Sequence, residues 1–237
     1  MEKLRWKFSY IKEEYKKVRE LGYTFITCEE YFNKKHSLPK NVVVNRVDID
    51  FSLKKTEVLL EIFEELGIKA SFFLRLHAPE YNPFSFEGYR IIKRIIANGH
   101  ELGYHSEIVD QAEIWSEDPL QCLKRDIAII ETGFDIKVKG IASHGGNTGL
   151  NNLDFWKNTR AKDLGFLYEA YDHEPEFNLF QEAFYVSDSE WTQWKCYDKG
   201  TLRVEDRRSL SEHAQDKHPL MHFLIHPDTY YFRHIYE

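Results

Sequence analysis

VVVNRVDID, residues 42–50, is the stretch that decides the fold of this 237-residue chain. Its β-branched residues crowd the turns of a helix but fit a pleated sheet, so we predict a strand. Side chains alternate along a strand, which places Arg46, Asp48 and Asp50 on one face and apolar residues on the other. The run is apolar on both faces where it begins, and this indicates a buried strand.

The two carboxylates at the end of this run need compensation if the strand is buried. Asp48 and Asp50 would both lose their hydration, so a cation, a metal ion or a shared proton must offset their charge. A solvated strand end on the surface is the alternative interpretation. The apolar residues that precede the carboxylates favour a functional site over that alternative.

The composition indicates a folded protein with a large core. Hydrophobic residues make up 42% of the chain and charged residues 30%, which argues against global disorder. The formal net charge of −7 disfavours a nucleic-acid partner. The three cysteines, Cys28, Cys122 and Cys196, form no CxxC pattern, which disfavours a disulfide framework or a thiolate zinc site.

The N-terminal sequence lacks the apolar core and the cleavage site of a signal peptide. No window of the chain approaches the length and apolarity of a membrane-spanning helix. We therefore expect a soluble, cytoplasmic protein without a membrane-spanning segment.

Helical and strand patterns alternate after the central run. Apolar residues recur at helical spacing in residues 53–66, 86–98 and 119–131, and glycines at 67, 99 and 133 are expected to end these helices. Strands are expected at residues 70–76, 101–105 and 137–143, with weaker candidates at 166–170, 184–186 and 220–225. Before the central run we expect a helix at 8–21, a strand at 23–26 and a short helix opened by the capping box of residues 27–30.

This alternation favours parallel strands joined by right-handed crossovers. About seven or eight strands fit a closed or nearly closed α/β barrel. We find no convincing linker, so we predict one domain over residues 1–237, with a helical lead-in at 1–41 and the barrel at 42–226.

The ends of the predicted strands carry groups that can bind a metal ion or move a proton. Active sites of β/α barrels lie at the C-terminal ends of the strands, and there we find Asp48, Asp50, Arg75, His77, His105, His144 and His226. One Asp and two His suit a divalent ion such as zinc, with one position left for water. The ion lowers the pKa of its water to about 7, a second carboxylate can act as base, and a His opposite can protonate a leaving amine. Such a set describes metal-assisted hydrolysis of an amide.

Three segments together resemble the polysaccharide deacetylase family, also called the NodB-homology or carbohydrate esterase 4 group. They are VDID at 47–50, GHELGYHSE at 99–107 and LIH at 224–226. The resemblance spans residues 42–226 and implies a distorted β/α barrel, usually of seven parallel strands.

The resemblance also implies roles for individual residues. Asp48 would be the catalytic base, Asp50 a metal ligand, His105 the first His of the second motif and His226 the catalytic acid. We expect Arg75, and Trp191 of the segment DSEW, to bind the substrate.

The chain departs from the family pattern at the second and third motifs. The second motif His would fall at position 109, where this chain has Val109, and Val cannot bind a metal. The third motif, normally an Arg before a turn, reads SHGG at 143–146. We expect His144 to supply the missing imidazole, which gives a metal site of Asp50, His105 and His144. Asp110 and Glu107 are the rival ligands.

Without a secretion signal, the chain resembles the cytoplasmic subgroup associated with surface-polysaccharide or O-antigen biosynthesis. The resemblance implies removal of an N-acyl group, acetyl or formyl, from a small sugar, a nucleotide-linked sugar or a lipid-linked saccharide. Zinc is the preferred cofactor. Because a ligand is missing at Val109, the alternative is a non-catalytic or repurposed carbohydrate-binding relative with a degenerate metal site.

Overall fold

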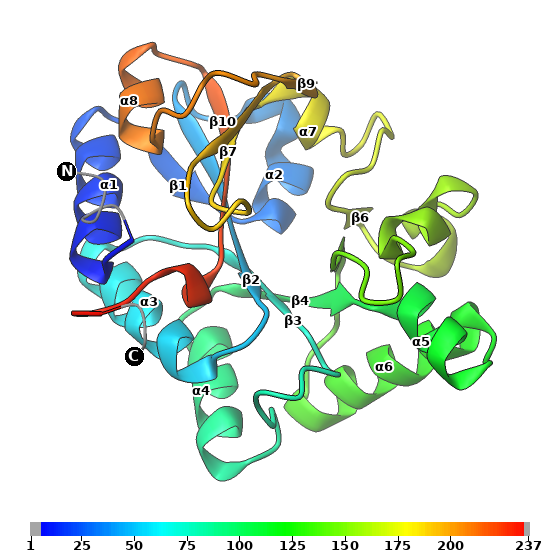
Figure 1. Cartoon of the computed structure of the whole chain (residues 1–237). Helices are drawn as coiled ribbons and strands as arrows, with labels where there is room; N and C mark the ends of the chain where they lie inside the picture. Colours follow the sequence, from blue (N-terminus) through cyan, green and yellow to red (C-terminus); the bar gives the residue numbers. More distant parts are fainter. Residues whose placement is uncertain (1–5, 235–237) are drawn as a thin grey trace.

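The computed structural model describes residues 6–234, and its strands form one mixed, mostly parallel sheet (Figure 1). The strands are β1 (Thr24–Ile26), β2 (Val42–Ile49), β3 (Ser71–Leu74), β4 (Glu101–Ser106), β5 (Gly140–Ser143), β6 (Tyr168–Glu169), β7 (Phe184–Ser187), β8 (Lys195–Asp198), β9 (Thr201–Leu202) and β10 (Leu220–Ile225). The α-helices are α1 (Phe8–Glu20), α2 (Cys28–Lys34), α3 (Leu53–Leu66), α4 (Phe86–Ala97), α5 (Ile108–Trp115), α6 (Pro119–Phe134), α7 (Leu179–Glu182) and α8 (Leu210–Gln215). Short 3-10 helices are η2 (Lys35–Ser37), η3 (Asn152–Lys157), η4 (Ala161–Leu164) and η5 (Pro227–Thr229).

The sheet has the order β6-β5-β4-β3-β2-β10-β7-β8-β9, and β1 pairs in parallel with the start of β2. The ladders from β6 to β7 are all parallel, whereas β8 and β9 continue the sheet as an antiparallel extension of β7. The prediction of a parallel-rich α/β fold is therefore confirmed. The strand count differs from the expected seven, since the described residues form a 10-stranded sheet, and no ladder among them joins β6 to β7.

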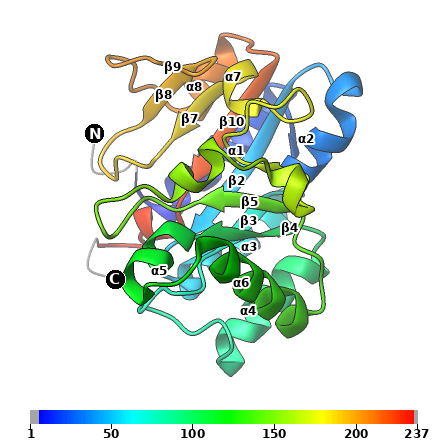
Figure 2. The same ribbon diagram turned by 90° about the vertical axis from the view of Figure 1, so that its right-hand side faces the viewer.

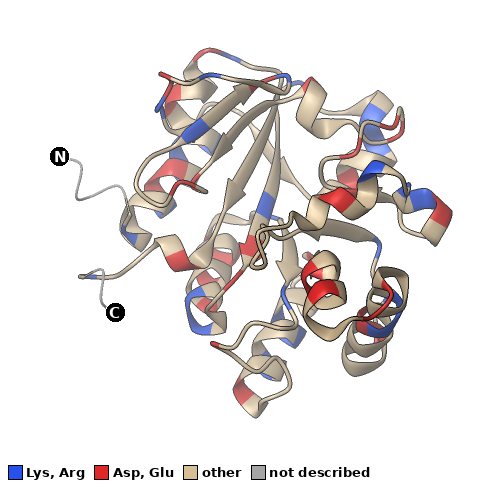
Figure 3. Ribbon diagram, turned by 45° about the vertical axis from the view of Figure 1, so that its right-hand side comes forward, with Lys and Arg blue, Asp and Glu red and all other residues tan. Residues whose placement is uncertain are grey.

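Helices α1, α3, α4, α5, α6 and α8 lie around the outside of the curved sheet (Figure 1). Successive contacts run from α8 to α1, α3, α4, α6 and α5, so these helices form a continuous belt. In Figure 2, α3, α4 and α6 lie on one side of strands β2 to β5, while β7, β8 and β9 lie at the other end of the molecule. Charged residues are concentrated on these helices and on the loops, and few of them lie on strands (Figure 3).

Two apolar clusters fill the two faces of the sheet. Val43, Val47 and Ile49 of β2 belong to the large cluster between the sheet and the helices. Val42 and Val44 belong to a smaller cluster on the concave face. Every residue of β2 is buried, as the apolar start of the strand predicted. The even-numbered face of β2 therefore carries its polar residues into the interior of the curved sheet, beyond the smaller cluster.

The helix boundaries follow local signals in most places. Thr27 forms the predicted capping box at the start of α2, and Gly67, with φ of 60°, ends α3. The expectation that Gly133 ends the third long helix is wrong, because α6 continues to Phe134 and Asp135 takes the left-handed conformation instead. Gly133 lies inside the helix, where a Cβ would come within 2.5 Å of the Phe84 ring.

Close packing at Gly103 of β4 gives a stability prediction. A Cβ at this position would lie 2.5 Å from the Phe73 ring and 2.8 Å from the backbone oxygen of Gly140. We expect Gly103→Ala to lower the free energy of unfolding by about 1–3 kcal/mol, because overpacking forces strands apart. Urea denaturation measures this, and Gly145→Ala is the control, since nothing lies within 4 Å of a Cβ there. Equal stability of the two variants would contradict the packing described here.

Within residues 6–234, no helix is both long enough and apolar enough to cross a membrane.

Candidate active site

The C-terminal ends of several parallel strands meet at one edge of the sheet. Asp48 lies opposite Phe73 of β3, and His105 of β4 lies opposite Ala142 of β5. His226 directly follows β10, which pairs with β2 on its other side. This register brings carboxylates and imidazoles from separate strands to a common place, as the strand-end pattern predicted.

Arg46 neutralises the first carboxylate of the site. Its Nε donates to Oδ1 of Asp48 over 2.8 Å, and its Nη2 donates to Oδ2 over 2.7 Å. Both side chains are almost fully buried, and the guanidinium also lies between the rings of Phe73 and Tyr171. Burial alone would raise the pKa of Asp48, but Arg46 and then His105 outweigh it and hold the pKa below its ordinary value. Asp48 is therefore a fixed, ionised carboxylate.

Breaking this buried pair should be costly. We expect Arg46→Met to lower the free energy of unfolding by about 3–5 kcal/mol, because it leaves the Asp48 carboxylate buried without its main partner. The double variant Arg46→Met/Asp48→Leu should recover much of that loss. Lys12→Met is the control, since its exposed pair with Glu65 should contribute at most about 1 kcal/mol. Guanidinium denaturation gives the three values, and a loss for Arg46→Met no larger than for Lys12→Met would refute this role.

Asp50 has no comparable partner. Its side chain is buried, and Oδ1 makes no hydrogen bond of acceptable geometry. The nearest charged groups are imidazoles: Nε2 of His105 lies 3.2 Å from Oδ1, and Nε2 of His226 lies 3.9 Å from Oδ2. Burial alone would raise the pKa of Asp50, but His105 and then His226 lower it. Asp50 is thus the carboxylate of the pair that still needs a cation.

His105 presents one ring nitrogen to both carboxylates. Its Nδ1 lies 2.8 Å from the backbone oxygen of Ala142, which can only accept, so Nδ1 carries a proton. Nε2 lies 3.4 Å from Oδ2 of Asp48 and 3.2 Å from Oδ1 of Asp50. An unprotonated Nε2 would repel these oxygens, so it requires either a proton or a metal ion. The pKa of His105 is accordingly raised, with Asp48 and then Asp50 outweighing burial.

His144 lies beside His105, with the ring centroids 5.2 Å apart and the rings nearly perpendicular. Its Nδ1 is buried without a hydrogen-bond partner, and Oε1 of Glu107 lies 3.9 Å from it. Burial and the neighbouring His105 lower the pKa of His144 to about 4, so this imidazole is neutral at pH 7. A neutral, unpartnered imidazole nitrogen is a suitable metal ligand.

The rival ligands are engaged in other contacts. Asp110 accepts hydrogen bonds from the backbone N–H of Asn147 and Thr148 and from the side chain of Asn152, so it anchors the loop that follows His144. Glu107 pairs with Arg75. Val109 packs against the large core and donates its N–H to Asn152. Of the three proposed replacements, His144 is the one with a possible ligand atom, Nδ1, that is buried and has no hydrogen-bond partner.

The donor set fits a divalent ion in part. Ligand atoms around tetrahedral zinc lie about 3.3 Å apart, given bond lengths of about 2.0–2.2 Å. The separation between His105 Nε2 and Asp50 Oδ1, 3.2 Å, matches that value. In residues 6–234, however, the two groups whose possible ligand atoms all lie within 4.8 Å of one another surround His213, and the set of Asp50, His105 and His144 is more open.

His226 is fixed by a carboxylate that the sequence did not single out. Asp188, which follows β7, is fully buried; it accepts from His226 Nδ1 over 2.6 Å and from its backbone N–H over 3.0 Å. Burial alone would lower the pKa of His226, but Asp188 and then Asp50 raise it to about 9. The ring is therefore protonated at neutral pH, with Nε2 directed towards the side of the site where Asp50 lies. Asp188 directly follows β7, so its position at a strand end is the sequence signal that could have identified it.

The two expected substrate-binding residues differ in accessibility. Arg75 is buried, and its Nε donates to Glu107 over 2.6 Å, so that edge of the guanidinium is occupied. Trp191 is 42% exposed, has φ of 61° and lies 5.6 Å from the His226 ring, centroid to centroid. Phe51, which the sequence did not single out, is 37% exposed and lies 6.0 Å from the Trp191 ring. These two rings form an exposed aromatic rim beside His226.

No protein-family model matches this sequence, and no curated protein matches it. Several solved structures are similar to this chain. Bc1974, a polysaccharide deacetylase from Bacillus cereus, is 18% identical, with 79% of each chain covered and a TM-score of 0.49. IcaB from Ammonifex degensii is 18% identical over 67% of this chain and 73% of that one, with a TM-score of 0.49. BA3943 from Bacillus anthracis, a pseudoenzyme of the carbohydrate esterase 4 family, is 19% identical, with a TM-score of 0.45. That match covers 79% of this chain and only 55% of BA3943.

Proposed function

We propose that this protein is a metal-dependent hydrolase that removes an N-acyl group, acetyl or formyl, from an amino sugar in surface-polysaccharide biosynthesis. Its substrate would be a nucleotide-linked or lipid-linked sugar in the cytoplasm. The observation that carries the proposal is the position of His105 Nε2, which lies between carboxylate oxygens of Asp48 and Asp50. Arg46 compensates Asp48, so Asp50 is left to bind a cation.

Asp50, His105 and His144 would hold the ion. When bound, a divalent ion supplies Lewis acidity, which polarises an acyl carbonyl and lowers the pKa of a water molecule beside it. Ala142 fixes the tautomer of His105 and leaves Nε2 available to the site. Asp110 holds the loop at 147–152. His144 precedes this loop, so Asp110 also supports the position of His144.

Asp48 is proposed as the general base. Oδ2 faces the same point as Asp50, because it lies 3.4 Å from His105 Nε2. Arg46 keeps the carboxylate ionised and restricts its rotation, so an acceptor stands ready for the proton of an attacking water.

His226 is proposed as the general acid. Asp188 binds Nδ1, which orients the ring and keeps it protonated. The other ring nitrogen, Nε2, lies 3.9 Å from Oδ2 of Asp50. A proton on Nε2 can therefore pass to the leaving nitrogen of the sugar. Base and acid then come from two neighbouring strands, since Asp48 belongs to β2 and His226 directly follows β10.

The rim of Phe51 and Trp191 supports a sugar as the substrate. Exposed aromatic faces stack on the apolar faces of sugar rings, and Trp191 lies next to the proposed acid, with Phe51 beside Trp191. Trp191 holds a left-handed backbone conformation, which is costly for a bulky residue and is found at functional sites.

The test is release of acetate or formate from nucleotide-linked N-acetyl and N-formyl amino sugars by the purified chain loaded with Zn²⁺. We expect release that EDTA abolishes and Zn²⁺ restores. A chain that binds these sugars and takes up zinc but releases no acid from either acyl series would contradict the proposed hydrolase and favour a binding protein.

A further inference from the structure

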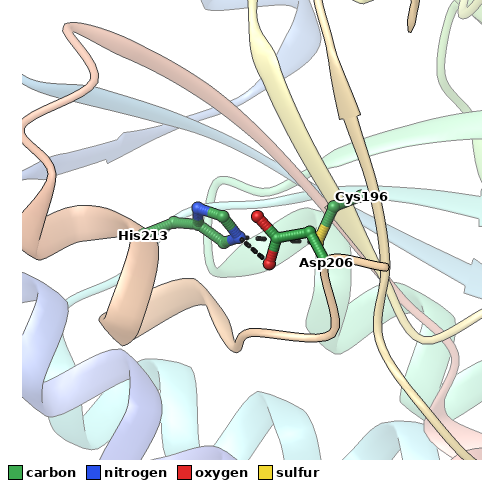
Figure 4. Close-up of side chains that lie close together, drawn as sticks. All are labelled: Cys196, Asp206 and His213. Atoms are coloured by element: carbon green, nitrogen blue, oxygen red, sulfur yellow. Dashed lines mark hydrogen bonds and ion pairs between the residues drawn. The ribbon is translucent and has the colours of Figure 1, made fainter. Parts of the chain in front are cut away.

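A second group of metal-binding side chains lies away from the strand ends (Figure 4). Cys196 belongs to β8, Asp206 to the segment between β9 and α8, and His213 to α8. Nε2 of His213 lies 3.3 Å from Oδ1 of Asp206 and 3.5 Å from Sγ of Cys196. Cys196 and His213 are fully buried, whereas Asp206 is partly exposed. A thiol, a carboxylate and an imidazole thus converge from three separate segments.

We propose that Cys196, Asp206 and His213 bind a structural divalent metal ion of the zinc class. The ion would tie the antiparallel extension of the sheet to α8. Cys196 packs in the large cluster on the helix side of the sheet, whereas Asp48 and Arg46 lie on the concave face, so this site is separate from the candidate active site.

The distances between the donor atoms match a zinc coordination shell. With Zn–S of about 2.3 Å and Zn–N of about 2.05 Å, tetrahedral geometry places sulfur and nitrogen about 3.6 Å apart, and nitrogen and carboxylate oxygen about 3.4 Å apart. The observed separations are 3.5 Å and 3.3 Å. All the ligand atoms lie within 4.8 Å of one another, which is not so for Asp50, His105 and His144.

The surroundings of His213 supply a suitable support for a ligand. Its Nδ1 is buried and has no hydrogen-bond partner, and Oδ2 of Asp216 lies 3.9 Å from it. Metal-bound histidines commonly direct their second ring N–H to a carboxylate, which orients the ring. Burial lowers the pKa of His213 to about 4, so the ring is neutral and its Nε2 can donate electrons to a metal.

Arg208 is a positively charged side chain next to the proposed ligands. Its Nε and its backbone N–H both donate to Oδ1 of Asp206, its Nη2 donates to Oδ2, and its Nη1 donates to Asp216. An ion bound through Oδ1 would therefore take the place of the Nε bond, while Nη2 keeps its bond to Oδ2. Access comes from a surface hollow of about 550 Å³ that Asp206 lines together with Arg207, Arg208 and Glu212.

Binding requires one deprotonation. Burial and then Asp206 raise the pKa of the Cys196 thiol to about 12, so it is protonated at neutral pH. The S–H bond breaks as the S–metal bond forms, and one proton leaves to solvent for each ion bound. The absence of a CxxC pattern had disfavoured a thiolate zinc site, but that pattern detects ligands close in sequence, and these three come from three separate segments.

Cobalt binding tests the proposal without any activity measurement. The full chain, stripped of metal and titrated with Co²⁺, should show a thiolate-to-cobalt charge-transfer band in the near ultraviolet. Cys196→Ser should abolish the band, and Asp206→Asn and His213→Asn should weaken Co²⁺ binding at least about 10-fold. Cys122→Ser is the matched control, because Cys122 is also a buried cysteine and its thiol donates to the Glu117 carboxylate. The band should also persist in Asp50→Ala, which removes a ligand of the other site.

Thermal melting provides a second readout. In the Asp50→Ala background, Zn²⁺ at about 100 times its Kd should raise Tm by about 5 °C or more, and adding Cys196→Ser should remove that rise. Wild-type protein without the band, or a band that survives Cys196→Ser, would overturn this site. Loss of the band in Asp50→Ala would show that the band depends on Asp50, and it would overturn a separate site as well. Loss of hydrolysis with the band retained would count against the proposed function alone.

Discussion

Asp48→Asn is expected to lower kcat by about 10²–10⁴-fold while the metal content stays unchanged. A positioned general base contributes that much to a proton transfer. The Asn side chain keeps an oxygen that can accept from Arg46 but has lost the capacity to take up the proton. Because Asp50, His105 and His144 are intact in this variant, metal binding should persist. Steady-state kinetics together with metal analysis of the purified variant measure both quantities.

A buried carboxylate far from the C-terminal ends of the strands provides the control. Glu101, at the start of β4, is buried and accepts hydrogen bonds from Ser71 and Tyr168. We expect Glu101→Gln to lower stability without lowering kcat. If Asp48→Asn turned over at the wild-type rate, Asp48 would not be the base, and if Glu101→Gln lost activity equally, the effect would be one of folding.

Asp50→Ala is expected to remove the metal ion from the active site and to lower activity by more than about 10³-fold. Asp50 is the carboxylate without a guanidinium partner, so its loss deprives the site of its negative ligand. The remaining imidazoles of His105 and His144 would bind a divalent ion weakly. Metal content after dialysis, measured alongside acyl release, gives both results.

His100→Asn is the matched control for this experiment. His100 lies in the same GHELGYH segment as His105 and is also buried, but its Nδ1 accepts from the backbone N–H of Ala70. An Asn oxygen can replace that acceptor, so metal content and kcat should stay near wild-type values. Retention of full metal content by Asp50→Ala would contradict the assignment of Asp50 as a ligand.

Local patterns predicted most of the fold. The apolar start of β2 indicated a strand buried on both faces, and the helical spacing of apolar residues located α3, α4 and α6. The antiparallel strands β8 and β9 were missed because their residues are mostly half-buried or exposed, so they show no clean alternation. Helix α5 was missed because two of its large apolar residues, Ile114 and Trp115, face solvent and blur the pattern.

The candidate site was predictable where one residue at a strand end carried the chemistry. Asp48 and His105 lie near the C-terminal ends of β2 and β4, Asp50 and His226 directly follow β2 and β10, and the structure places all four close together. The pairing of Arg46 with Asp48 was predictable in part, because strand alternation placed both side chains on one face and the buried carboxylates needed a cation. The pairing of Asp188 with His226 was not visible, since it joins residues on different strands and depends on the order of β7 and β10 in the sheet.

The cluster around His213 could not be predicted from the sequence. Its three side chains come from β8, a connecting segment and α8, and no spacing rule links them. Only the packing of α8 against the end of the sheet brings their donor atoms together. Residues of this kind are found from distances between side-chain atoms and not from motifs.

The most direct measurement is an anomalous-scattering map of a crystal of the full chain soaked with Zn²⁺. We expect a zinc peak within bonding distance of the Asp50 carboxylate and His105 Nε2, with His144 as the third protein ligand and Asp48 still bound to Arg46. A zinc-loaded crystal with no peak between Asp50 and His105, or with His144 turned away from the ion, would contradict this expectation.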